Sequence, residues 1–242
     1  MIDLHSHILF GIDDGPPDIA GSLELAHAAV ADGITTMVCT PHARAAYLAG
    51  NNRVTLIHER IAALRAAFVA EGIALQLIPG TEIYAEPESV ELLRQGFVLP
   101  LGASRTVLIE FPANILLNTL EQMVFAFQLA GYRVLVAHPE RIQAVRQAPD
   151  LLTPLINRGV FFQLTAEALI GAQGERMHII ATTLVQQRLV QVLASDSHGT
   201  HLDRMPALRP AVARASALIG EAAALAMVQS TPAALLAPAY IV

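Results

Sequence analysis

The chain has 242 residues, of which 54% are hydrophobic and 15% are charged, and its formal net charge is −6. This length fits one barrel-type domain, and the acidic balance argues against nucleic acid as the main partner, because phosphate backbones favour basic surfaces. Polar residues interrupt every long apolar stretch, so no membrane span of about 20 apolar residues is expected.

Short apolar runs alternate with helical patterns along the chain, and glycine follows most of the helical patterns, where it would end a helix. In the first half, the expected elements are a strand at Met1–Leu4, a helix at Ile19–Asp32, a strand at Ile34–Thr40, a helix at Val54–Ala70, a strand at Ile73–Ile78 and a helix at Pro87–Gln95. The second half predicts a strand at Thr106–Glu110, a helix at Leu116–Ala130, a strand at Arg133–Ala137, a helix at Leu151–Arg158, a strand at Val160–Leu164, a helix at Ile179–Gln187, a strand at Val190–Ala194, and helices at Ala207–Gly220 and Glu221–Val228.

This alternation of strands and helices predicts the fold class. Strand and helix alternate about seven times, which indicates a parallel sheet with crossover helices. We therefore expect an α/β fold that closes into a distorted TIM-like (β/α)7 barrel, with an open, doubly wound sheet as the alternative. There is no linker or low-complexity segment, so residues 1–242 are interpreted as a single domain.

Potential metal ligands follow the expected strands at their carboxyl ends. The residues in these positions are His5, His7, His42, Glu82, Glu110, His138, Asp196 and His198. In a parallel barrel these ends lie on one face, where active sites are built. Asp13 and Asp14, in a glycine-flanked loop, can reach the same face. Mixed imidazole and carboxylate ligands suit Mn, Fe or Zn, and we expect a cofactor of two or three such ions, of unspecified identity.

Two arginines near these ligands indicate the kind of substrate. Arg141 follows His138 by three residues, and Arg204 follows His198 by six. Guanidinium groups bind phosphate in a bidentate manner and stay charged, so a phosphate ester is expected. A thiolate phosphatase is excluded, because Cys39 is not followed by arginine at a spacing of six. No glycine-rich nucleotide-binding fingerprint is present either.

Six motifs, in order, carry a resemblance to a known family. They are His5-Ser-His7, Thr40-Pro-His42, Gly80-Thr-Glu82-Ile-Tyr84, Leu108-Ile-Glu110-Phe111, Ala137-His138-Pro-Glu-Arg141 and Ala194-Ser-Asp196-Ser-His198. The set resembles the PHP (polymerase and histidinol phosphatase) superfamily. The opening MIDLHSHILFGIDDGP is more specific, and it is similar to the bacterial tyrosine-protein phosphatases of capsular and exopolysaccharide operons.

The resemblance implies a trinuclear metal centre. The first ion would be held by His5, His7, Glu82 and Asp196, the second by Glu82, Glu110 and His138, and the third by Asp14, His42 and His198. Arg141 and Arg204 would bind the phosphate, and His42 would contribute to catalysis. The implied reaction is hydrolysis of phosphotyrosine by metal-activated hydroxide. The implied substrate is the tyrosine-rich tail of a partner bacterial tyrosine kinase that controls polysaccharide chain length.

The chain departs from the family pattern in one place. Some relatives have a further histidine after the strand that follows Gly159, whereas this chain reads Gln163-Leu-Thr-Ala-Glu-Ala168 there. His201 lies between His198 and Arg204, so its participation in the site stays open. A small-molecule phosphatase, such as histidinol-phosphate phosphatase, and a metal-binding scaffold without turnover are the alternative functions.

Localisation and assembly have weaker signals. The N-terminus has neither a basic region nor an apolar segment, so no signal peptide is expected. The single cysteine, Cys39, excludes an intrachain disulfide and suits a reducing compartment, so we expect a cytoplasmic protein. Low charge and many Ala and Leu residues leave room for an apolar surface through which the chain would form a homo-oligomer.

Overall fold

The computed structural model describes residues 1–44, 53–199 and 204–238 and contains strands that all pair in parallel. The strands are β1 (Ile2–Ser6), β2 (Thr36–Cys39), β3 (His42–Ala43), β4 (Gln76–Pro79), β5 (Glu82–Tyr84), β6 (Thr106–Glu110), β7 (Arg133–Ala137), β8 (Phe161–Thr165) and β9 (Val192–Ala194). They form one sheet of order β1-β2-β4 and another of order β3-β5-β6-β7-β8-β9.

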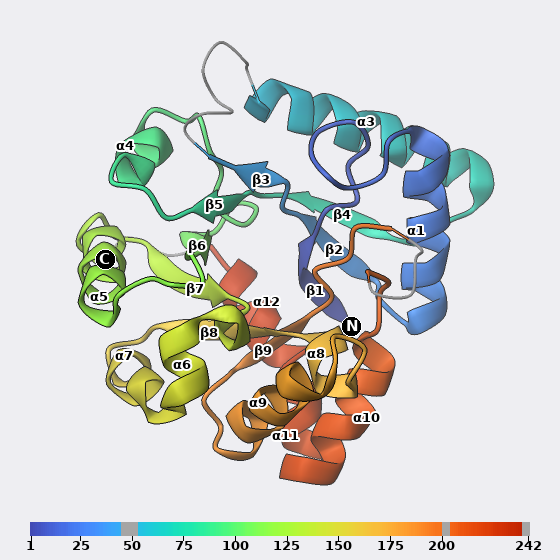
Figure 1. Cartoon of the computed structure of the whole chain (residues 1–242). Helices are drawn as coiled ribbons and strands as arrows, with labels where there is room; N and C mark the ends of the chain where they lie inside the picture. The colour runs from blue at the N-terminus through green and yellow to red at the C-terminus, as the bar shows by residue number, and fades with distance from the viewer. Residues whose placement is uncertain (45–52, 200–203, 239–242) are drawn as a thin grey trace.

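These two sheets make up one ring of strands (Figure 1). β3 follows β2 after two residues and β5 follows β4 after two residues, so each pair occupies one position in the ring. At the other junction, His7 N donates to Ser197 O (2.8 Å) and Asp196 N donates to His5 O (2.9 Å). These hydrogen bonds join β1 to the segment after β9. The ring therefore has seven positions, as expected for the distorted barrel and not for an open sheet.

Helices surround this ring (Figure 1). The larger ones are α1 (Ile19–Asp32), α3 (Arg53–Glu71), α5 (Leu117–Leu129), α9 (Glu175–Gln186) and α10 (Leu208–Ile219). The shorter α-helices are α4 (Ser89–Arg94), α6 (Gln143–Gln147), α7 (Thr153–Asn157), α8 (Ala166–Ile170), α11 (Glu221–Ala226) and α12 (Ser230–Leu236), and two 3-10 turns are η1 (Pro139–Arg141) and η2 (Pro149–Leu152). Within the described residues, no helix is both long enough and apolar enough to cross a membrane.

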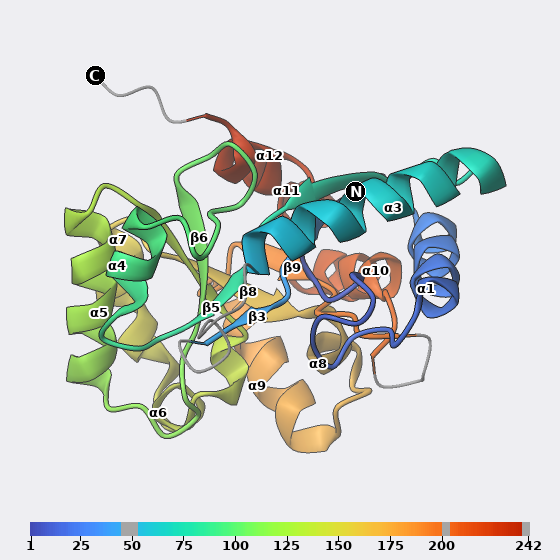
Figure 2. The same ribbon diagram turned by 90° about the horizontal axis from the view of Figure 1, so that it is seen from above.

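The barrel interior has its own hydrophobic cluster, distinct from the layer between strands and helices. Leu108 and Leu135 point inward, whereas their neighbours in β6 and β7 pack against the helices. Leu235 of α12 joins the interior cluster. Thr106 Oγ1, at the first residue of β6, donates to Leu235 O (2.6 Å). α12 therefore covers the amino ends of the strands, and Figure 2 shows it away from the carboxyl ends.

Local sequence signals explain where the first helix begins and ends. The Asp18 side chain accepts a hydrogen bond from Gly21 N (3.0 Å) and so caps α1. Gly33 ends the helix in a left-handed conformation, with φ of 92°, that a residue with a Cβ would adopt only with strain. This helix follows the loop that carries Asp13 and Asp14, so its start fixes one end of that loop.

Several expected boundaries were wrong. The helix expected at Leu151–Arg158 is divided into η2 and α7, because Pro154 occupies the first turn of a new helix. α9 begins at Glu175 instead of Ile179, directly after Gly174. The short elements β3, β5, α6, α8 and α12 were not expected.

Candidate metal centre

Seven of the nine expected ligands lie near the carboxyl ends of strands or in the loops that follow, and His42 and Glu82 begin the short strands β3 and β5, which continue β2 and β4. The nine are His5, His7, Asp14, His42, Glu82, Glu110, His138, Asp196 and His198. Within the described residues they form four overlapping groups whose ligand atoms lie within 4.8 Å of one another. The groups share members, so the residues make one continuous cluster. That these residues bind metal stays a prediction.

Two imidazole rings face each other at the centre of this cluster. The Nε2 atoms of His5 and His7 lie 3.2 Å apart. Asp196 Oδ1 lies 3.2 Å from His5 Nε2 and 3.5 Å from His7 Nε2. All three residues are buried. A cation between these atoms would satisfy them together, which is the arrangement of a mixed imidazole and carboxylate site.

Glu82 lies between the other ligands and is positioned to bridge them. Its Oε1 lies 2.9 Å from His138 Nε2 and 3.4 Å from His5 Nε2. Its Oε2 lies 2.7 Å from His42 Nδ1. Glu110 lies further out, with Oε1 3.9 Å from His138 Nε2 and Oε2 4.0 Å from His42 Nδ1. Oε1 of Glu82 thus faces His5 and His138 together, and Oε2 faces His42. The bridging role of Glu82 stays a prediction.

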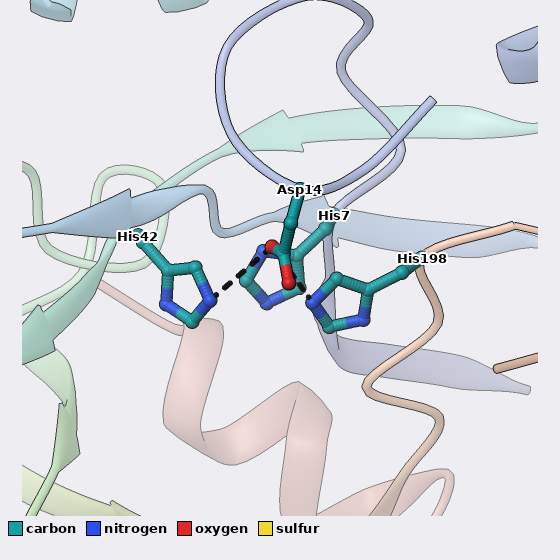
Figure 3. Close-up of side chains that lie close together, drawn as sticks. All are labelled: His7, Asp14, His42 and His198. Carbon is teal, nitrogen blue, oxygen red and sulfur yellow. Dashed lines mark ion pairs between the residues drawn. The ribbon is translucent and has the colours of Figure 1, made fainter. Parts of the chain in front are cut away.

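A third part of the cluster lies under the loop between β1 and α1. Asp14 Oδ1 lies 3.4 Å from His42 Nε2 and 3.2 Å from His198 Nε2 (Figure 3). The His7 ring stacks on the His198 ring, with 3.9 Å between centroids. The adjacent Asp13 turns the other way, toward the His7 ring. The structure thus separates the two neighbouring aspartates into two roles.

The histidine nitrogens that face away from the centre are held by hydrogen bonds. His5 Nδ1 lies 2.9 Å from Gln163 Oε1, and His7 Nδ1 lies 2.8 Å from Asp13 Oδ2. His198 Nδ1 lies 2.8 Å from Asp196 O. An acceptor at Nδ1 holds a ring proton there, so that in the neutral form of the ring the Nε2 lone pair faces the cluster, which is how proteins orient metal-binding histidines.

Two of the ligands have an unfavourable backbone conformation. Among the described residues other than glycine, three have positive φ, and two of them are His138 (φ 34°) and Asp196 (φ 52°). A residue with a Cβ adopts this region only when its surroundings hold it there, and such residues gather at functional sites. His138 directly follows β7, and Asp196 lies two residues after the end of β9. The backbone turn at each position directs the side chain into the cluster.

The electrostatics of the cluster are dominated by its buried carboxylates. Burial lowers the pKa of His5, but the charges of Glu82 and Asp196 outweigh it and raise the pKa to about 9. Burial and the neighbouring His7 lower the pKa of His198 to about 4. Burial opposes ionisation of Asp13, but its hydrogen bond with His7 lowers its pKa to about 2. The buried carboxylates therefore favour positive charge on His5, whereas the low pKa of His198 favours its neutral ring.

The donor set fits divalent metal ions. Glu82 Oε2 and Glu110 Oε2 are buried and accept no hydrogen bond, although His42 Nδ1 lies 2.7 Å from the first and Arg44 Nη2 lies 3.5 Å from the second. Buried carboxylate oxygens of this kind are stabilised by a nearby cation. Imidazole nitrogens and carboxylate oxygens in this proportion suit Mn, Fe or Zn better than Ca or Mg.

A cavity of about 500 Å³ opens beside the cluster and is lined by the expected arginines. Arg141 forms an ion pair with Asp196. Arg204 Nη1 lies 2.9 Å from Asp14 Oδ2. Both guanidinium groups thus border the space next to the cluster, and their binding of phosphate stays a prediction.

Other residues at the site had escaped the sequence analysis. Arg44 lines the cavity, and Gln163 supports His5. Glu167, in α8, also lines the cavity and accepts a hydrogen bond from Met205 N (2.9 Å). This carboxylate lies in the segment where some relatives have a histidine. Of these residues, only Arg44 could have been predicted from the sequence, because it lies two residues after the expected ligand His42. His201 lies outside the described residues.

Comparison with known proteins gives concordant matches. A family model described as capsular polysaccharide synthesis, CpsB/CapC, matches residues 1–237. The tyrosine-protein phosphatase YwqE of Bacillus subtilis is 36% identical over 198 residues, which are 82% of this chain and 77% of YwqE. The tyrosine-protein phosphatase CpsB of Streptococcus pneumoniae is 29% identical over 215 residues, which are 85% of each chain.

A solved structure matches almost the whole chain. It comes from crystal structures of YwqE from Bacillus subtilis and CpsB from Streptococcus pneumoniae, which are described as unique metal-dependent tyrosine phosphatases. It superposes with a TM-score of 0.87 and 33% sequence identity, and the match covers 98% of this chain and 94% of that one.

Proposed function

The chain belongs to the CpsB/CapC family of capsular polysaccharide synthesis proteins, and from this premise we propose that it is a metal-dependent protein-tyrosine phosphatase. The observation that carries the proposal is the convergence of nine His, Asp and Glu side chains beside a cavity bordered by Arg141 and Arg204. Cationic groups and metal ligands together suit a phosphate monoester.

Three ions would share the nine ligands as the resemblance implies. His5, His7 and Asp196 would hold the first ion, Glu110 and His138 the second, and Asp14, His42 and His198 the third, with Glu82 bridging the first two. When bound, such ions polarise phosphoryl oxygens and help water to ionise near neutral pH. Support comes from the distances of 2.7–4.0 Å between Glu82 or Glu110 and the neighbouring imidazole nitrogens.

Arg141 and Arg204 would bind and orient the phosphoryl group. Each guanidinium has five N–H donors in a fixed plane, and each uses some of them on a ligand carboxylate, Asp196 or Asp14. These ion pairs hold the guanidinium planes in place and leave other donors for the substrate. The phosphoryl oxygens would then be oriented before reaction, which lowers the entropic part of the barrier.

A protein substrate is supported by a second hollow next to the first. A pocket of about 510 Å³ shares Asp14, His198 and Arg204 with the cavity and continues along Pro16, Pro17 and the start of α1. A chain that presents phosphotyrosine to the cavity would have room for its neighbouring residues there. We propose the tail of a bacterial tyrosine kinase as this chain. We also propose a cytoplasmic location, since Cys39 is a buried free thiol.

The first experiment compares three substrates with one metal-loaded preparation. They are a phosphotyrosine peptide, histidinol phosphate and p-nitrophenyl phosphate, each also tested with His42→Ala. Preference for the peptide, lost in the variant, would support the proposal. Preference for histidinol phosphate would keep the metal site and overturn the protein substrate. No turnover of any ester at confirmed metal content would overturn the phosphatase function and favour a scaffold.

A further inference from the structure

Arg44, Tyr84 and Glu110 come from three adjacent strands beside the cavity. The parallel register pairs Ala43 with Ile83 and Tyr84 with Glu110. Arg44, which directly follows Ala43, therefore lies beside Tyr84. The guanidinium carbon of Arg44 lies 4.0 Å from the centroid of the Tyr84 ring, and its Nη2 lies 3.5 Å from Glu110 Oε2. Both the face and the edge of this guanidinium thus have a partner.

The position of Arg44 relative to the cavity sets what its other face can contact. Arg44 lines the cavity, whereas Tyr84 does not. The guanidinium therefore lies between the tyrosine ring and the open space, and its side chain is 38% exposed. Among the described residues that line the cavity, none has a phenyl, phenol or indole ring. A substrate ring that entered would find Arg44 as a planar cation already backed by an aromatic ring.

We propose that Arg44, held by Tyr84, stacks on the aromatic ring of the substrate and makes the site selective for aryl over alkyl phosphates. This inference rests on the proposed phosphatase function and names a group that sets its substrate class. Guanidinium groups stack on aromatic faces through both charge and planarity. Arg141 and Arg204 contact the ligand carboxylates and would bind the phosphoryl group, so the aryl part of the ester is left to another residue.

The alternative role for Arg44 is a third contact to phosphate. The two roles differ in what they discriminate. A phosphate contact would strengthen binding of every phosphate or phosphonate alike. A stacking contact would strengthen binding only of those that carry an aromatic ring. The matched pair phenylphosphonate and cyclohexylphosphonate separates them, because the two rings have similar size and only one is aromatic.

The test measures inhibition constants of both phosphonates against hydrolysis of p-nitrophenyl phosphate, with direct binding by calorimetry as a second measurement. The full chain is loaded with metal, and Arg44→Met is compared with the unmodified protein. We expect the preference for the phenyl over the cyclohexyl compound to fall roughly 3- to 30-fold, the range given by cation–π contacts. Tyr84→Leu should lower the preference in the same direction, whereas Tyr84→Phe should retain it.

Arg105→Met is the matched control. Arg105 stacks on Tyr132 at 4.7 Å from the ring centroid, at the amino end of β6 and far from the cavity. Its replacement should leave the preference unchanged. Equal loss of affinity for both phosphonates in Arg44→Met, or an unchanged preference, would overturn the stacking role. Failure of the unmodified protein to hydrolyse any phosphate ester would instead count against the proposed function.

Discussion

Gln163 Oε1 lies 2.9 Å from His5 Nδ1, and both side chains are fully buried in the barrel. The amide oxygen can only accept, so it holds a ring proton on His5 Nδ1, and in the neutral, metal-binding form of the ring the Nε2 lone pair would face Glu82 and Asp196. We expect Gln163→Leu to lower metal affinity about 10- to 100-fold, as loss of such supporting contacts does elsewhere. Competition with a metal chelator measures it. Gln128→Leu, at a half-buried position on α5 where the amide also makes one hydrogen bond, is the control, and equal affinity in both variants would contradict the prediction.

The neighbouring aspartates Asp13 and Asp14 should respond differently to the same change. Asp14→Asn replaces a proposed ligand, whereas Asp13→Asn alters the support of the His7 ring and of the backbone at Gly15 and His42. We expect Asp14→Asn to lower the number of bound ions per chain. Asp13→Asn should keep that number at saturating metal and weaken the affinity. Elemental analysis and metal titration of the two variants measure these outcomes. Fewer bound ions per chain in Asp13→Asn than in Asp14→Asn would contradict the prediction.

The arginines at the cavity should affect turnover more than metal content. Arg141→Met and Arg204→Met each remove charged hydrogen bonds worth about 1.5–3 kcal/mol, so kcat/KM for a phosphotyrosine peptide should fall roughly 10- to 100-fold. Metal content per chain, measured on the same samples, should stay within error. Arg94→Met, in an exposed ion pair on α4, serves as the control. A loss of metal that parallels the loss of rate would indicate a role in holding the ligands.

Removal of metal should destabilise the folded chain. The cluster brings buried carboxylates and imidazoles together, and a ligand that binds only the folded state stabilises it by about 4 kcal/mol at a thousandfold excess over its dissociation constant. The midpoint of thermal unfolding should therefore rise on titration with Mn and fall after chelation. His27→Ala, at an exposed position on α1, should show the same rise, since it lies outside the cluster. A midpoint that does not change with metal would contradict the assigned site.

α12 covers the end of the barrel where the strands begin, so the stability of that end should depend on its packing. Leu235 is 1% exposed and packs inside the ring, whereas its neighbour Leu236 is only partly buried. We expect Leu235→Ala to cost about 2–5 kcal/mol of unfolding free energy, and Leu236→Ala to cost less. Urea unfolding of both variants measures the difference. Equal costs would mean that α12 does not cover the interior as described.

The sequence predicted the repeating elements well, because their signals are local. β6 and β7 have the expected bounds, since each is an apolar run that begins directly after a polar first residue, Thr106 or Arg133. α1 also has its expected bounds, with a cap at Asp18 and a glycine at its end. The short strands β3 and β5 were missed, because two or three residues carry no periodicity of their own.

The candidate site shows a similar division. Strand ends identified the residues of the cluster, because parallel topology alone brings them to one face. The contacts of Gln163 with His5 and of Arg44 with Tyr84 were not predicted, since they join residues 158 and 40 positions apart. Such pairs depend on the register between strands, which no local pattern specifies.

The seam of the barrel has a consequence for the order in which the molecule assembles. The backbone of His5 accepts a hydrogen bond from Asp196 N, and the side chains of the same two residues meet in the cluster. During synthesis the first strand leaves the ribosome early and must wait for nearly the whole polypeptide before its partner emerges. Shortened chains that end before β9 would therefore lack both the closing strand and the ligands that follow it, so completion of the ring and completion of the metal centre are one late step.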